Sequence, residues 1–491
     1  MPTSDPDMPD WHLPIQQEDT VRIWTRSRVL VALFAVTAFV VAACGTRVDH
    51  DSIVRAADTG AGPGASEVAP GEPGSAGDVP GATDEPGTGH AAGQTAHAAR
   101  GSGTAGERGG TAGNAGAADG ESGGQGGGTS GDPIVVGSVG AYPGPGGAAL
   151  AQGARALQAW GAHVNANGGI DGRPVKVVVM DDGGDAAKAR SLMKELVEEY
   201  NAVAVVAAMT VVETLNSWKG YVHEKKVPVV GGTCGPEWVK APMLFRQCSS
   251  SANQIYGTAL VGAKHGDGPK FGGLFCSETQ SCTYVEEQLF DKGGAKRAGL
   301  DPVYRARISV FQADFTAECI QARNAGVELF MVIGDPNTVE RVSSSCRRQN
   351  FNPQYLQMSS TMRPQFASNP SFENGLVSMS VFPFAGLRTP AFEEFDAAWQ
   401  RFGDGNDPGP AAAQAWSSAK LFERAASSAG SEISRSSITT QLRKLRDERL
   451  GGLTVPLNYD ASGVSDVPCT YFMRIAGGKW TAPEGDDLTC W

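Results

Sequence analysis

Residues 164–182 read VNANGGIDGRPVKVVVMDD and combine a helix end, a glycine turn and a buried strand. Asn167 and Gly168 favour the left-handed conformation that closes a helix, and Gly172 permits a second reversal. Pro174 then opens an apolar, β-branched run that ends in two carboxylates. This order predicts the close of one α/β crossover unit.

The same alternation of strands and helices continues through residues 132–491. Strands are predicted first at 134–139, 175–180, 203–208, 227–231 and 244–248, with helices at 148–164, 185–200 and 214–224. A second series has strands at 271–275, 303–309, 329–334 and 355–358, with helices at 283–292, 315–325 and 338–349. Strands at 376–382 and 471–475 and helices at 390–402, 411–428 and 437–446 follow. The pattern predicts an α/β protein of doubly wound parallel sheets, in two lobes because the segment is too long for one core.

The sequence of residues 164–182 closely resembles the end of the first helix in extracytoplasmic solute-binding proteins of the branched-chain amino acid (leucine/isoleucine/valine) type. Those proteins capture small solutes for ABC importers. The resemblance covers residues 132–491 and implies the type I periplasmic binding protein fold, with a three-segment hinge near 250, 383 and 470. The N-terminal lobe would comprise residues 132–250 and 383–470, and the C-terminal lobe residues 251–382 and 471–491.

The N-terminus has the features of an export signal. Arginines between positions 22 and 28 precede an uncharged run at 29–41, which is too short for a membrane span. The run leads into Val-Ala-Ala-Cys, which resembles a bacterial lipobox, so residues 1–43 are predicted to be a lipoprotein signal peptide and Cys44 the lipidated residue. A plain signal peptide with a chance cysteine is the alternative. Either way the protein is exported, and with the lipid it is anchored to the outer face of the cell membrane.

Residues 44–131 consist almost entirely of Gly, Ala, Ser, Thr, Asp, Glu and Pro. Such a segment cannot bury enough apolar surface to offset the entropy of ordering it. It is therefore predicted to be a disordered tether between the anchor and the folded part.

Composition and motifs argue against several classes of function. A formal net charge of −12 is unsuited to a nucleic-acid partner. Residues 132–491 contain neither G-x-S-x-G nor H-E-x-x-H, and their Gly-rich first loop does not match the phosphate motifs. We therefore expect no enzyme, no cofactor and no metal, and an exported enzyme is the least favoured reading.

The cysteines support export. The chain has nine, and setting Cys44 aside leaves an even number, which in an exported protein indicates disulfides. Proximity in the expected fold favours the pairs Cys234–Cys248, Cys276–Cys282, Cys319–Cys346 and Cys469–Cys490. A zinc site is a weaker alternative, because no C-x-x-C pair occurs and few histidines lie in the folded part.

Ligands of open parallel sheets bind beyond the carboxyl ends of the strands. In the resembled family, the loops after the third and fourth strands hold the carboxylate and amino groups of an amino acid. The resemblance implies these first-lobe positions: Thr210, Val211, Gly232, Thr233 and Cys234. Tyr142 is a further candidate, because it follows the first strand at the same edge of the sheet. Val211 and Cys234 depart from the pattern because they lack hydroxyl groups, although backbone N–H groups at a helix N-terminus still bind an anion. A bulky side chain at Gly232 is expected to block the site without disturbing the fold.

The second lobe is expected to contribute Ser277, Asp335 and Ser359. Asp335 either meets a ligand ammonium or caps the helix that follows it. Phe382, near the hinge, either packs on the ligand or belongs to the core.

These observations predict a lipid-anchored solute-binding protein and not an enzyme. It would capture a small polar solute, an amino acid or a related compound. Its partners would be that small-molecule solute and an ABC permease, and it is expected to be a monomer. The alternative is a ligand-sensing lipoprotein that signals to a membrane receptor without transport. Neighbouring permease and ATPase genes would favour the first, and a neighbouring histidine kinase gene the second.

Overall fold

The computed structural model describes residues 131–142, 147, 150–238, 241–459 and 466–491. The signal peptide, Cys44 and most of the tether lie outside these residues. The described residues belong to one compact unit and form two sheets, and we call the parts built on them the first and second lobes.

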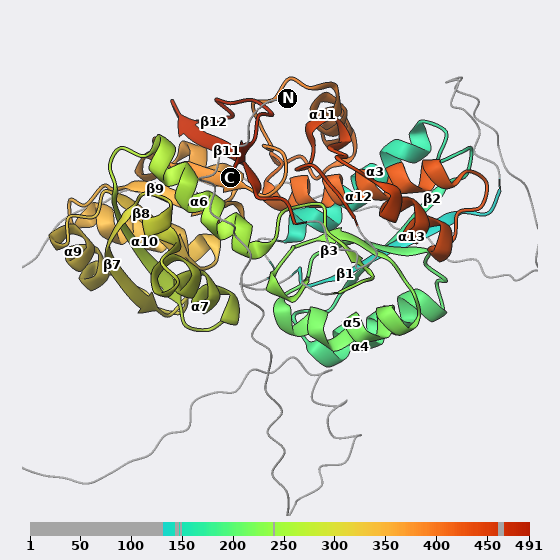
Figure 1. The fold of residues 1–491 in the computed structure, drawn as a ribbon, viewed down its shortest axis with the longest axis horizontal. Coiled ribbons are helices and arrows are strands. Elements are labelled where there is room, and N and C mark those ends of the chain that lie inside the picture. Colours follow the sequence, from blue (N-terminus) through green and yellow to red (C-terminus); the bar gives the residue numbers. More distant parts are fainter. Residues whose placement is uncertain (1–130, 143–146, 148–149, 239–240, 460–465) are drawn as a thin grey trace, which may run out of the picture. The chain divides into compact units, whose positions relative to one another are not determined.

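The first sheet is parallel throughout and has the order β2-β1-β3-β4-β5. Its strands are β1 (Ile134–Gly140), β2 (Val175–Asp181), β3 (Ala204–Ala208), β4 (Val229–Gly232) and β5 (Leu244–Phe245). Helices α4 (Ala186–Glu198) and α5 (Val212–Glu224) cover one face, and α3 (Ala151–Ala166) lies on the other (Figure 1). The strand order reverses between β1 and β3, which is where such folds bind ligands.

The glycine turn between α3 and β2 largely follows the prediction. Gly168 and Gly172 have φ values of 93° and 78°, which glycine adopts without strain. Asn167 instead ends the helix with φ −104°, so its predicted left-handed conformation is wrong. Asn165 makes the join to the sheet, because its side-chain amide exchanges two hydrogen bonds with the backbone of Val175, of 2.7 and 2.9 Å.

The second sheet has the order β12-β11-β10-β9-β8-β6-β7. Its parallel strands are β6 (Lys270–Cys276), β7 (Asp301–Ile308), β8 (Leu329–Ile333), β9 (Gln354–Met358) and β10 (Leu376–Met379). Strands β11 (Cys469–Ala476), β12 (Lys479–Thr481) and β13 (Thr489–Cys490) pair antiparallel. The helices are α6 (Ser251–His265), α7 (Gln280–Glu286) with a π-helical extension (Glu287–Asp291), α8 (Gly294–Arg297), α9 (Thr316–Asn324) and α10 (Pro336–Arg348).

Helix α6 was not predicted from the sequence. It is built largely from small residues that allow close packing: a Cβ at Gly257 would lie 2.8 Å from Trp491, and one at Gly262 would lie 2.5 Å from Leu356. Such a helix lacks the large apolar residues at helical spacing on which sequence-based prediction relies.

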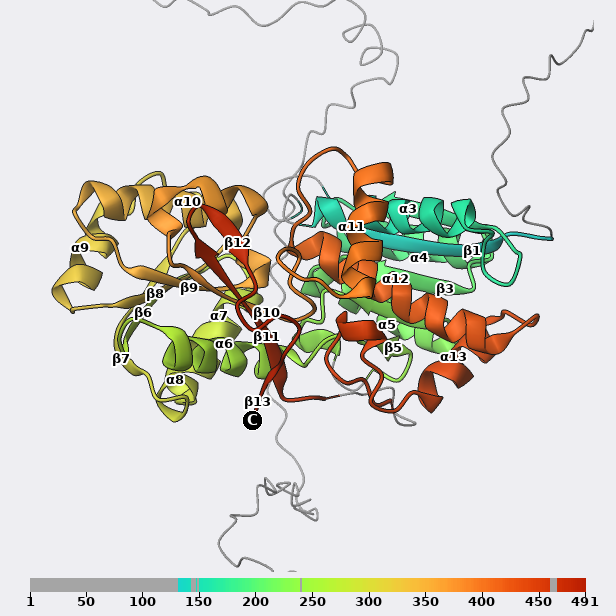
Figure 2. The same cartoon turned by 90° about the horizontal axis from the view of Figure 1, so that it is seen from above.

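After β10 the chain returns to the first lobe through α11 (Pro390–Phe402), α12 (Pro410–Ala429) and α13 (Arg435–Lys444). Helices α11 and α12 pack against α3, far away in sequence, and α12 also contacts β3 and β4 (Figure 2). Short 3₁₀ helices at Pro236–Trp238, Ser359–Thr361, Pro364–Ser368, Pro370–Phe372 and Leu450–Gly452 complete the elements. The chain thus passes between the two sheets before α6, after β10 and before β11.

Four disulfides join the eight cysteines of the folded part in the predicted pairs. They are Cys234–Cys248, Cys276–Cys282, Cys319–Cys346 and Cys469–Cys490. The first ties the loop after β4 to the crossover that leads into α6, and the others brace the second lobe. Disulfides of this kind typically stabilise a protein by about 2–4 kcal/mol each.

Candidate functional site

The carboxyl ends of strands β1 to β4 bring the predicted first-lobe residues together. The amide of Ala141 donates to the carbonyl of Met209 (3.0 Å), which joins the loops after β1 and β3. The hydroxyl of Thr233 donates to the carbonyl of Thr210 (3.1 Å), which joins the loops after β3 and β4. The three loops that carry the predicted first-lobe residues therefore meet on one edge of the sheet, at the reversal of strand order.

The start of α5 is the part of this edge best suited to an anion. Val211 is the N-cap residue and makes no side-chain capping bond, so the first N–H groups of the helix lack a side-chain acceptor. Thr210, directly before it, is 3 % exposed, and its hydroxyl has no hydrogen-bond partner among the described residues. Buried hydroxyls without partners are rare, so this pair of features indicates a position where a ligand supplies the missing acceptor.

The loop after β4 is rigid and largely satisfied internally. The N–H and C=O of Gly232 are both hydrogen-bonded to the side chain of Gln247, at 3.0 and 2.8 Å. A Cβ at Gly232 would lie 2.4 Å from the carbonyl oxygen of Ala208. A bulky residue there would disturb the sheet, so the expectation that it would leave the fold intact is wrong. Cys234 is held in its disulfide with φ 56°, and Thr233 is the member of this loop with a side-chain hydroxyl near the α5 start.

Tyr142 folds back towards β1. Its hydroxyl lies 3.0 Å from that of Ser138, and burial raises the pKa of the phenol well above its ordinary value. Its amide donates to a carboxylate oxygen of Asp181 (3.1 Å). Asp181 and Asp182, at the end of β2, accept from the amides of Gly183 and Gly184, so this acid pair shapes the turn.

In the second lobe, the reversal of strand order falls between β6 and β8. Ser277 follows β6, is exposed, and its hydroxyl donates to the carbonyl of Ile308 (3.2 Å). Glu278, which sequence reasoning passed over, accepts from the amide of Val310 (3.2 Å). Desolvation acts to raise the pKa of Glu278, but hydrogen bonds from Ser309 and from backbone amides outweigh it and lower the pKa. An ionised carboxylate therefore stands at this edge.

Asp335 caps α10, which is one of the two roles considered for it. One carboxylate oxygen accepts from the amides of Asn337 (2.9 Å) and Thr338 (3.3 Å), and the other accepts from the Thr338 hydroxyl (2.5 Å). These bonds use most of the acceptor sites of the carboxylate.

Ser359 and Phe382 are both buried. Ser359 is 5 % exposed and begins the 3₁₀ helix after β9. Phe382 is fully buried and packs edge-on against Phe395, with ring centroids 5.2 Å apart, and against Phe392. The ring of Phe382 thus belongs to the core beneath α11.

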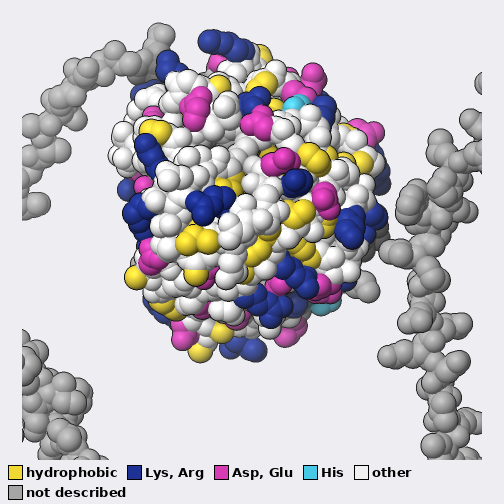
Figure 3. Space-filling model, turned by 90° about the vertical axis from the view of Figure 1, so that its left-hand side faces the viewer, with side chains coloured by type: hydrophobic (Ala, Val, Ile, Leu, Met, Phe, Trp, Pro, Cys, Tyr) yellow, Lys and Arg dark blue, Asp and Glu magenta, His cyan; other side chains and the backbone are white. Residues whose placement is uncertain are grey.

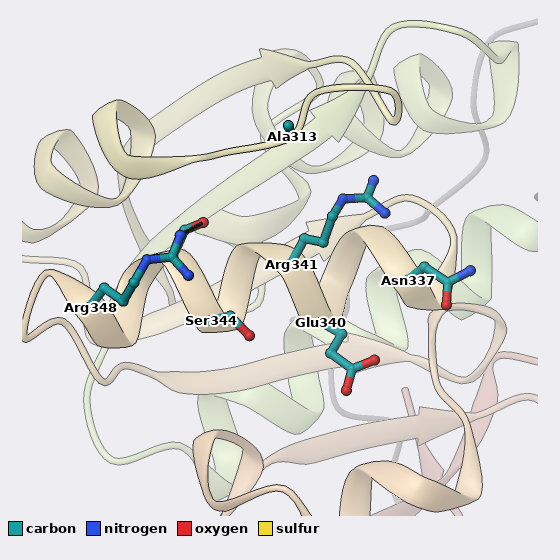
Figure 4. A pocket seen from close by; sticks show the side chains of 7 residues that line it. Ala313, Asn337, Glu340, Arg341, Ser344 and Arg348 are labelled. Carbon is teal, nitrogen blue, oxygen red and sulfur yellow. Dashed lines mark hydrogen bonds between the residues drawn. The ribbon is translucent and has the colours of Figure 1, made fainter. Parts of the chain in front are cut away.

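A pocket of about 360 Å³ lies elsewhere on the second lobe, between α10 and the loop after β7. The side chains of Arg341 and Arg348 point towards the loop that carries Ala313, and Glu340 points away from it (Figure 4). Arg341 donates to the Val310 carbonyl, and Arg348 donates to Asp314 (2.7 Å). Because these guanidinium groups already bind the protein, the pocket is a weaker candidate than the α5 edge.

One face of the second lobe can be inspected directly for charged patches. Basic and acidic side chains are interspersed on the face of the second lobe (Figure 3), with pairs such as Arg307–Glu286 at 2.7 Å. Across the described residues, no three His, Cys, Asp or Glu side chains are grouped to hold a metal. None of the helices in that part of the chain combines the length and apolar character needed to cross a membrane.

Comparison with solved structures places the fold. A valine-bound branched-chain amino acid ABC transporter protein from Thermus thermophilus has a TM-score of 0.63 at 16% identity, over 72% of this chain and 95% of that one. The isoleucine complex of the substrate-binding protein LivJ from Streptococcus pneumoniae has a TM-score of 0.59 at 18% identity, over 73% and 99%. A fatty acid ABC transporter substrate-binding protein from Thermomonospora curvata has a TM-score of 0.60 at 18% identity, over 73% and 93%.

No curated protein matches the chain. A family model described as "Periplasmic binding protein" matches residues 133–479, which is most of the chain and includes both sheets. The two lobes built on largely parallel sheets, the candidate anion site at the start of α5 and this match agree with the resemblance seen in the sequence. The chain therefore belongs to the periplasmic binding protein family, has the type I fold, and is a solute-binding protein and not an enzyme.

Proposed function

We propose that this protein captures a small polar solute that carries a carboxylate, an amino acid or a related compound, and delivers it to an ABC importer. The observation that carries the proposal is the start of α5. There a helix N-terminus without a side-chain cap adjoins the buried hydroxyl of Thr210, which has no partner within the described part of the chain. A helix N-terminus attracts negative charge, and a hydroxyl donor beside it fixes one carboxylate oxygen.

The solutes of the structural neighbours support a carboxylate. Valine and isoleucine are bound in two of them, and a third is described as serving fatty acid transport. These compounds share the carboxylate and differ in the rest of the molecule. The rest of the ligand would meet the second lobe, where Ser277 is exposed and Glu278 is ionised and suited to an ammonium group.

Capture would involve closure of the lobes about the three crossings. A solute that contacts both lobes shifts the balance towards the closed form by its differential affinity for the two forms. The ABC permease would then receive the solute from the closed protein.

The anchor is a separate part of the proposal. We infer that Cys44 carries lipid and that residues 44–131 tether the folded part to the outer face of the cell membrane. The lipobox-like Val-Ala-Ala-Cys and the composition of the following segment support this. The alternative, a lipid-anchored sensor that signals to a membrane receptor, shares the anchor and the solute but not the permease.

Labelled palmitate tests the anchor. The wild-type chain should incorporate label in a bacterial host that processes lipoproteins, and Cys44→Ala should incorporate none. Incorporation that persists in Cys44→Ala would overturn the assignment.

A thermal-stability screen followed by calorimetric titration tests the site. The chain is screened against amino acids, their amides and short fatty acids, and a solute at 100 times its Kd should raise the free energy of unfolding by about 2.7 kcal/mol. The solute that is found is then titrated by calorimetry. Thr210→Val should then weaken binding of that solute about tenfold, because a hydrogen bond to a charged group is typically worth about 1.5–3 kcal/mol.

Thr258→Val is the matched control. Thr258 is also fully buried, but its hydroxyl bonds within α6 to the carbonyl of Gln254 (2.8 Å). This control should keep wild-type affinity. Equal affinities for Thr210→Val and the wild type would show that the site lies elsewhere.

A further inference from the structure

Gln247 fixes the loop after β4 by an unusual contact. Its side chain is fully buried, accepts from the N–H of Gly232 (3.0 Å) and donates to the C=O of the same residue (2.8 Å). One amide therefore satisfies both backbone polar groups of Gly232 and sets the orientation of the peptide planes on either side. Thr233, which contacts the α5 edge, directly follows.

A covalent bond reinforces the same connection. Cys234 and Cys248 form a disulfide, and they follow Gly232 and Gln247 by two residues and one residue. The loop after β4 is thus tied at two points to residues 247–248, which lie in the crossover between β5 and α6. Two hydrogen bonds and one disulfide therefore hold these two segments together.

The contact extends to the second crossover through α12. The Gln247 amide also donates to the carbonyl of Gln414 (3.3 Å), and the Gln414 side chain donates to the hydroxyl of Ser380 (3.2 Å). Gln414 and Ser380 are 8 % and 3 % exposed. Ser380 follows β10, where the chain leaves the second sheet for the first lobe.

We propose that Gln247 is a positioning residue that couples the ligand-side loop after β4 to the crossover at Ser380, through Gln414. The ligand's place at this edge rests on the proposed function, whereas the coupling itself does not. These hydrogen bonds are buried, so no water replaces a partner that is lost. A displacement that breaks one bond is therefore costly unless the next side chain moves with it and keeps the bond. Solute contact at Thr233 would in this way bias the crossover that must bend during closure.

Hydrogen–deuterium exchange of the full, disulfide-intact chain without added solute tests the coupling. Gln247→Met keeps the side-chain volume but removes the bonds to Gly232 and Gln414. We expect exchange to become at least tenfold faster both in residues 229–234 and in residues 380–389. Ser380→Ala removes the other end of the chain of bonds and should accelerate exchange in residues 229–234, which it does not touch.

Gln354→Met is the matched control. Gln354 is 7 % exposed and likewise bonds backbone groups, accepting from the amide of Asp267 (2.8 Å) and donating to the carbonyl of Asn374 (2.9 Å). It should lower the thermal midpoint comparably while leaving residues 229–234 and 380–389 as in the wild type.

Unchanged exchange at 380–389 in Gln247→Met, or at 229–234 in Ser380→Ala, would overturn the coupling. If Gln247→Met does not fold, Ser380→Ala decides alone. Because no solute is added, failure here is distinct from failure of the proposed function, which the titrations test.

Discussion

At the scale of single residues, the sequence predicts chemistry best where the partner is close in the chain. Asp335 is an example, because a cap is recognisable from the helix that follows it. The role of Gln247 was beyond such reasoning, since its partners are Gly232 and Gln414, and nothing local in the sequence marks them. Gly232 was misjudged for the same reason: its tight packing against Ala208 arises from the neighbouring strand.

Asp182 offers a residue-scale prediction about pH. It is 1 % exposed, one of its carboxylate oxygens has no partner among the described residues, and burial raises the pKa of the carboxyl. The folded state therefore holds the proton more tightly than the unfolded state. The charge destabilises the folded state once the pH exceeds the unfolded value, which is about 3.9, and has no effect at lower pH where both states are protonated.

Asp182→Asn should accordingly raise the free energy of unfolding at pH 7, because it removes the charge that burial disfavours. The gain should shrink as the pH falls and vanish below about pH 4. Urea denaturation at several pH values measures it. Asp185→Asn is the control, because this nearby acid is exposed and Asn caps α4 as well as Asp does. A loss of stability in Asp182→Asn at pH 7 would contradict the argument.

At the scale of elements, hydrophobic periodicity predicted strands β1 to β11 and most helices within a few residues. It failed for α6, most of whose buried residues are glycines and other small residues, with Ile255 and Val261 as the exceptions. The disulfide pairs followed once the order of elements was assumed, because cysteines on adjoining elements are brought within reach. Cys319 and Cys346, on α9 and α10, are the clearest case.

The disulfides should differ in their contribution according to the loop that each closes. Cys319–Cys346 spans 27 residues and Cys276–Cys282 spans 6. The chain-entropy relation gives about 3.5 kcal/mol for the first and about 2.2 kcal/mol for the second. Both pairs are buried, so replacing each pair by alanine leaves comparable cavities. The difference between the two losses in unfolding free energy then reflects the length of the loop that each disulfide closes. Chemical denaturation should show a larger loss for Cys319→Ala with Cys346→Ala; an equal or smaller loss would contradict the loop argument.

At the scale of the whole molecule, the sequence predicted two doubly wound lobes but not how they are connected in detail. The three crossings are tied together by buried side chains. Ser249 donates to the carbonyl of Cys469 (2.7 Å), and the hydroxyls of Ser378 and Thr470 lie 2.7 Å apart. These contacts join residues more than 90 positions apart, which sequence patterns do not reveal.

Closure is the prediction that belongs to this scale. A solute that contacts both lobes should favour a closed form. A shift of the closed-to-open ratio from 1:99 to 99:1 needs a solute that binds the closed form more tightly by about 5.5 kcal/mol. With the solute identified by thermal stabilisation, X-ray scattering from the folded part should show a smaller radius of gyration at saturation. Thr210→Val should reach the same radius only at about tenfold higher solute concentration, because it weakens binding without altering the crossings. Thr258→Val should follow the wild-type titration. A radius that stays constant while calorimetry shows saturation would mean that the solute binds one lobe alone, and the hinge would then have no part in capture.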